Sequence, residues 1–151
     1  MQRIFSSDGP SVFHLSAHEK ELFLKVLELY PLIPDGHSRL SKTEAPALEE
    51  AQRLLDEALA EQRQTNRRQL DAMLASPQRF TAQRRGFRLR LASSEIEQLL
   101  QILNDIRVGC WLLLGSPEEP KRQRMLGDPK KMPYIVVMDL CGHFQSALLQ
   151  E

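Results

Sequence analysis

The amino-terminal part of the chain has the hydrophobic pattern of a β-hairpin followed by an amphipathic helix. Two short β-favouring runs at 3–5 and 12–15 flank an Asp-Gly pair, which is a strong turn signal. Ser16 and Glu19 then have the spacing of a capping box, and apolar residues recur at helical spacing over 22–30. We therefore predict two strands and a capped helix.

The rest of the chain contains three further helical patterns and one further strand pattern. A helix is expected over 43–75, although its apolar stripe lapses over 61–68, where we expect it to project from the body or to break. Residues 87–91 alternate like a half-buried strand. Further helices are predicted over 96–114 and 134–149, and the last is apolar on nearly all sides.

These elements predict a single helical domain over residues 1–151, in the mainly α (α+β) class. Residues 15–27 and 91–103 both show a strand end, an acidic helix start and an amphipathic helix, which places both strands in one sheet. We expect about four helices packed on a small sheet of two or three strands. Residues 115–133, rich in proline and basic side chains, are expected to form a mobile basic loop.

Composition favours an ordinary globular protein. Charged residues make up 26% of the chain, and no apolar run is long enough to cross a membrane. The first residues lack the apolar core of an export signal, and the two cysteines lie in apolar stretches, as in proteins of a reducing compartment. We therefore expect a cytoplasmic protein that does not bind membranes.

The net charge of zero conceals an uneven distribution. Residues 1–61 carry six Lys and Arg against eleven Asp and Glu, a net of −5. Residues 62–94 carry eight arginines against one aspartate, a net of +7, and the remaining six basic against eight acidic residues give −2. Such asymmetry bears on the choice of partner.

The basic segment 79–90 is the main candidate for partner binding, and Arg84, Arg85 and Arg88 are its candidate residues. Arginines interleaved with phenylalanines can contact phosphates and bases. Alternatively, they can pair with the acidic face of the first two helices, which includes Glu49, Glu50, Asp56 and Glu57. Because the chain is neutral overall, we expect the second arrangement and no nucleic-acid binding.

Polar residues also interrupt the apolar helices. Arg107 falls on the apolar stripe of 96–114, and Asp139 interrupts the apolar run of the last helix. Since a buried charge needs a partner, we predict a buried pair between them, with Asn104 and Gln145 supplying hydrogen bonds. The same four residues would also suit a polar ligand pocket.

Local catalytic and metal-binding signatures are lacking. His14 and His18 fall on different expected elements, and Cys141 and His143 lack a second close pair. There is no phosphate-binding glycine loop, nucleophile elbow or paired-cysteine motif. We expect no metal, no cofactor and no enzymatic activity.

Two segments, 103–115 and 139–148, resemble a bacterial family known as domain of unknown function number two thousand and seventeen, best represented in actinobacteria. The resemblance lies in the run Leu-Asn-Asp-Ile-Arg and in a closing helix with Asp, Gly, Gln and Leu at similar intervals. The middle third matches poorly, and Leu140 and His143 stand where the family usually has tryptophans. The resemblance implies no chemistry, but family genes often neighbour that of a Clp-protease adaptor, which implies a connection with regulated proteolysis.

The leading prediction is a helical interaction or regulatory protein with a protein partner whose identity the sequence does not give. Apolar residues at 111–113 and over 134–149 predict a homodimer. A nucleic-acid-binding regulator that uses residues 79–90 is the first alternative. An enzyme whose site is assembled from distant residues is the second.

Overall fold

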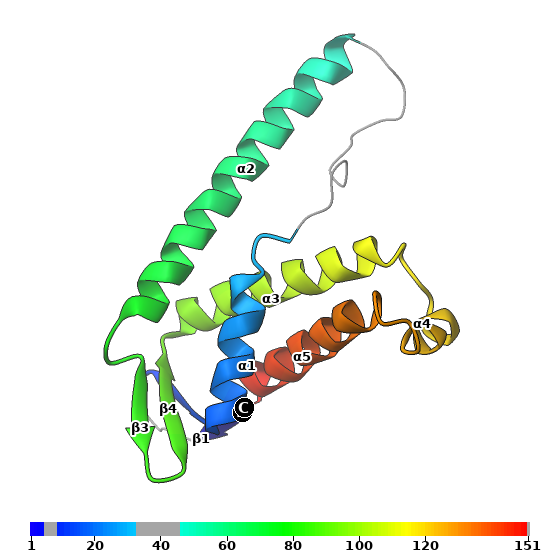
Figure 1. Cartoon of the computed structure of the whole chain (residues 1–151). Helices are drawn as coiled ribbons and strands as arrows, with labels where there is room; N and C mark the ends of the chain where they lie inside the picture. The colour runs from blue at the N-terminus through cyan, green and yellow to red at the C-terminus, as the bar shows by residue number, and fades with distance from the viewer. Residues whose placement is uncertain (5–8, 33–45, 151) are drawn as a thin grey trace.

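The structure is a computed structural model that describes residues 1–4, 9–32 and 46–150. Figure 1 shows its helices and strands. In chain order they are β1 (Gln2–Ile4), β2 (Ser11–Leu15), α1 (Ala17–Glu28), α2 (Pro46–Ala75), β3 (Phe80–Gln83), β4 (Gly86–Leu91), α3 (Ser93–Leu113), α4 (Glu119–Met125) and α5 (Met132–Leu149). The fold is a mixed α+β fold dominated by helices, as the hydrophobic pattern predicts.

The strands form one antiparallel sheet in the order β1-β2-β4-β3. Phe13 of β2 lies opposite Leu89 of β4, so the two segments expected to share a sheet do so. Over the described residues the sheet has four strands rather than two or three, because β3 adds an edge strand that the sequence pattern did not predict. Gly86 begins β4 at a φ of +110°, and a Cβ there would lie 2.2 Å from the carbonyl oxygen of Leu15.

The core lies between one side of the sheet and the helices. Phe13 and Leu89 are fully or almost fully buried and face this side. The capping box of α1 is present, with the Glu19 amide donating to Ser16 Oγ at 3.1 Å. Phe23 of α1 meets Phe144 of α5 edge to face, with ring centroids 4.9 Å apart. Among the described residues, no helix is both long and apolar enough to cross a membrane.

Part of the expected loop over 115–133 is helical, so that prediction is wrong in its extent. Pro120 occupies the first turn of α4, where its missing N–H costs no hydrogen bond, and Met125 is buried. α5 begins at Met132. Two residues with positive φ, Gly115 at 79° and Ser116 at 54°, turn the chain away from α3.

The long helix α2 has two unlike halves. Asn66, Leu70 and Met73 are buried in its carboxy-terminal half. There the Asn66 amide donates to the Tyr30 hydroxyl at 3.2 Å, so the polar middle of α2 is an anchor. The amino-terminal half, residues 46–61, projects away from the sheet and the other helices (Figure 1). We call residues 46–61 the arm.

Candidate interaction surface

The outer side of the sheet and the adjoining hairpin tip carry four arginines of the basic segment. Successive side chains of a strand point to opposite faces. Leu89 and Leu91 of β4 are buried in the core, so Arg88 and Arg90 lie on the outer side. Arg84 and Arg85, both exposed, form the two-residue connection between β3 and β4. We call Arg84, Arg85, Arg88 and Arg90 the arginine face.

Two polar contacts hold parts of the arginine face in position. The His14 imidazole Nε2 lies 2.6 Å from the Arg85 carbonyl oxygen, which ties the hairpin tip to β2. In the amide orientation that satisfies both Gln83 and Arg88, the side-chain oxygen of Gln83 accepts two hydrogen bonds from Arg88. One comes from Nε at 3.0 Å and the other from Nη2 at 2.8 Å. These contacts hold the Arg85 backbone and the Arg88 side chain in place, and neither of them brings a carboxylate to the arginine face.

Carboxylates are absent from this surface as far as the structure describes the chain. None lies within ion-pair distance of the four arginines among residues 1–4, 9–32 and 46–150. By strand register, the remaining side chains on the outer side are Gln2, Ile4, Val12, His14, Thr81 and Gln83. Ile4 is 41% exposed. The result is a surface with four positive charges beside two aliphatic side chains.

The predicted pairing of these arginines with the acidic residues of the second helix is wrong. Glu50 and Glu57 both bind Arg53, one turn away on the same helix, at 2.6 and 2.5 Å. Asp56 accepts a hydrogen bond from the Gln52 amide at 2.8 Å. Side chains three and four residues apart on a helix are neighbours, so these acids find local partners in their own helix.

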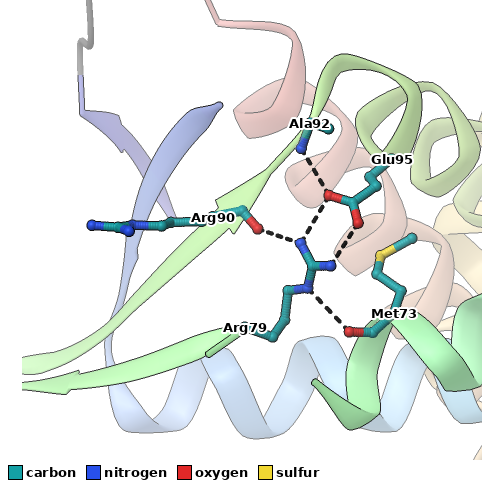
Figure 2. Close-up of polar contacts among 5 residues, drawn as sticks. All are labelled: Met73, Arg79, Arg90, Ala92 and Glu95. Atoms are coloured by element: carbon teal, nitrogen blue, oxygen red, sulfur yellow. Dashed lines mark hydrogen bonds and ion pairs between the residues drawn. The ribbon is translucent and has the colours of Figure 1, made fainter. Parts of the chain in front are cut away.

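Arg79, at the start of the same basic segment, behaves differently (Figure 2). Its guanidinium binds both oxygens of Glu95, at 2.5 and 2.8 Å. It also donates to the carbonyl oxygens of Met73 at 3.0 Å and Arg90 at 2.5 Å. Arg79 therefore joins the end of α2, the end of β4 and the start of α3. Figure 2 shows the Arg90 side chain pointing away from this cluster.

Glu95 is adapted to this role. Its carboxylate also accepts from the Ala92 amide at 2.8 Å, which completes the first turn of α3. Partial burial raises the pKa of Glu95, but the hydrogen bonds from Arg79 and Ala92 outweigh it and hold the pKa below its ordinary value. Arg79 and Glu95 are 15% and 25% exposed, so the pair is partly shielded from water.

The predicted buried pair between Arg107 and Asp139 is wrong. Both residues and Asn104 are exposed, and Asp139 is paired with Arg122 of α4 instead. Gln145 is half-buried and donates to the Leu100 carbonyl oxygen of α3 at 3.3 Å. Arg107 is not among the buried residues of α3, so its charge remains in water. None of the four residues is buried, so they do not form the buried polar cluster that the sequence predicted.

The cysteines lie in the core, between α3 and α5. Burial raises the pKa of the Cys110 thiol to about 11 and that of Cys141 to about 12, which favours unreactive thiols. Across the described ranges, no group of three or more His, Cys, Asp or Glu side chains is placed to hold a metal ion.

Several apolar side chains expected at a subunit contact are exposed. Trp111 is 39% exposed and donates its indole N–H to the Pro117 carbonyl oxygen at 3.3 Å, so one edge of its ring is held by the following turn. Leu113, Tyr134 and Val136 are exposed to a similar degree. Most of α5 nevertheless packs against α1 and α3, so its apolar residues serve mainly the monomer core. The homodimer through these residues stays a prediction.

No protein-family model matches the chain, and comparison with curated proteins and with solved structures gives no match. The resemblance to the actinobacterial family therefore also stays a prediction.

Proposed function

We propose that the protein is a non-enzymatic interaction protein that binds an acidic protein surface through the arginine face. The observation that carries the proposal is that Arg88 and Arg90 lie on the outer side of the sheet, Arg84 and Arg85 are exposed at the adjoining hairpin tip, and none of the four has an acidic partner among the described residues. Other arginines, such as Arg79, have internal acidic partners. An uncompensated basic surface attracts and orients an acidic partner.

The neighbouring aliphatic residues favour a protein as the partner. Ile4 and Val12 lie on the same side of the sheet as Arg88 and Arg90. Protein interfaces combine apolar contact with arginine, which is enriched there relative to lysine. We also propose that the protein works in the cytoplasm. A role beside regulated proteolysis rests on the family resemblance alone.

Nucleic-acid binding is the second candidate, and the absence of acid on the arginine face favours it. Among the described residues this side of the sheet carries no Phe, Tyr or Trp on which a base could stack, because Phe80 and Phe87 lie on the other side and meet Lys20. The His14 imidazole is the one ring on the outer side as far as the structure describes it. Phosphate contacts would therefore supply most of the affinity. We place this candidate second for that reason.

The test is binding of a labelled polyglutamate peptide and of a labelled DNA duplex, followed by fluorescence anisotropy at low salt. The combined variant Arg84→Glu, Arg85→Glu and Arg88→Glu should lose peptide binding. The matched control makes the same charge change at Lys121, Arg124 and Lys130, three exposed residues of the α4 region. It should bind as the wild type does.

The two ligands separate the two candidates. Peptide binding that exceeds duplex binding at equal salt supports the protein partner. Duplex binding that is the stronger of the two, and that weakens with salt with a log–log slope of about −3, would make nucleic acid the better function. Equal binding of peptide by the wild type and the triple variant would contradict the proposal.

A further inference from the structure

We propose that the arginine face binds the acidic arm of a second copy of this chain. This inference rests on the proposed function and names the partner. The arm carries Glu49, Glu50, Asp56, Glu57 and Glu61 against Arg53, a net charge of −4. The arginine face carries four positive charges. Two surfaces of opposite sign and similar magnitude thus stand open on a chain whose net charge is zero.

One side of the arm carries an apolar side chain among its charges, as does the surface around the arginine face. Glu50, Leu54, Glu57 and Glu61 are spaced by four, three and four residues, so they lie along one side of the helix. Leu54 is 53% exposed, in the middle of this row. A leucine between carboxylates complements Ile4 and Val12 beside arginines.

The two surfaces of one molecule are too far apart to neutralise each other. Glu61, the acid of the arm nearest the body, is separated from the end of α2 at Ala75 by about 21 Å of rigid helix. Arg79 and β4 lie beyond that end, and the arm points away from them (Figure 1). A separation of about 21 Å or more exceeds the Debye length, which is about 10 Å at 0.1 M salt. A second molecule can bring the two surfaces into contact.

Local pairing within the arm does not prevent this contact. Arg53 already binds Glu50 and Glu57, but all three side chains are more than half exposed. Exposed helix pairs of this kind are weak, because water screens the two charges. Glu49 and Glu61 have no ion-pair partner in the ranges the structure describes.

The experiment is sedimentation velocity on the full chain over a range of concentrations, with two charge-reversed variants. The face variant carries Arg84→Glu, Arg85→Glu and Arg88→Glu. The arm variant carries Glu50→Lys, Glu57→Lys and Glu61→Lys. The wild type should self-associate at about 50 mM salt and at least about tenfold more weakly at 0.5 M, because screening weakens exposed charge pairs. Each variant alone should be monomeric.

An equimolar mixture of the two variants tests directly whether the arm of one copy contacts the arginine face of another. The acidic arm of the face variant then meets the unaltered arginines of the arm variant, while the lysines of the arm variant meet the new glutamates. Association should therefore return in the equimolar mixture. Unchanged circular dichroism of each variant excludes unfolding as the cause of the single-variant loss.

The outcomes separate this inference from the function on which it rests. A wild type that is monomeric at low salt but binds polyglutamate through the arginine face would overturn the self-association and leave the acidic partner in place. A wild type that neither associates nor binds polyglutamate would overturn both. Self-association that persists in both variants would place the contact elsewhere and contradict the inference.

Discussion

The two ends of the basic segment 79–90 use the same side chain for opposite purposes. Arg79 is mostly buried, and its guanidinium is held by Glu95 and two carbonyl oxygens. Arg84, Arg85 and Arg90 are exposed and have no acidic partner among the described residues. The difference shows that the charge of a segment does not define its role. What matters is whether the fold places an acid beside each cation.

The largest expected effect is at Arg79. Arg79→Ala should lower the free energy of unfolding by about 3 kcal/mol, because it leaves Glu95 without its cation and two carbonyl oxygens without donors. For a domain of this size the melting temperature should fall by about 10 °C. Arg79→Lys keeps the charge but not the two-pronged contact, so its loss should be intermediate.

A melting temperature of Arg79→Ala equal to that of the wild type would contradict this prediction. Arg79 would then belong with the open arginines, and the comparison between the two ends of the segment would fail.

The acid that holds Arg79 should give stability a pH dependence. The pKa of Glu95 is lower in the folded protein than in the unfolded chain. Its contribution is therefore present above about pH 4.5 and is lost as the pH falls through the folded-state value. Wild type and Glu95→Gln should differ most at neutral pH and converge in acid.

Thermal unfolding of both proteins between neutral and acidic pH measures this difference. Glu97→Gln, an exposed change two residues along α3, serves as the control and should alter stability by less than about 0.5 kcal/mol at neutral pH. A stability difference for Glu95→Gln that grows as the pH falls would have the wrong sign for the account.

A smaller effect is expected at Asp139, where the sequence predicted a large one. Asp139 is exposed and pairs with Arg122, so Asp139→Asn should cost less than about 1 kcal/mol. A buried partnership with Arg107 would instead cost about 3–5 kcal/mol on removal of one charge. Chemical denaturation distinguishes the two values.

The sequence predicted the fold better than the surface. Alternation in 87–91 and the capping box at Ser16 determined elements that the structure confirms, because both patterns describe local geometry. The extra strand β3 was not predicted because only two of its four residues, Phe80 and Thr81, favour β structure. The clearest sign of this strand in the sequence was the glycine at position 86. In the structure Gly86 has a positive φ and lies close to β2, as the hairpin requires.

The polar predictions depended on which helix faces meet, and periodicity alone does not determine that. Asp139 appeared buried because α5 is apolar on nearly every side, yet the helix turns Asp139 toward Arg122 and water. The basic segment could be identified from composition. The division between Arg79 and Arg84–Arg90 could not, because it depends on the distant Glu95 and on the register of β4.

The most direct test of the account measures stability and binding on the same two variants. We expect Arg79→Ala to melt at a markedly lower temperature and, below that temperature, to bind polyglutamate as the wild type does. The combined Arg84→Glu, Arg85→Glu and Arg88→Glu variant should melt within a few degrees of the wild type, because Arg84 and Arg85 are exposed and the half-buried Arg88 loses only its contact with the Gln83 amide. It should no longer bind the peptide. A triple variant that unfolds, or that binds as tightly as the wild type, would contradict the claim that these arginines form an open binding surface.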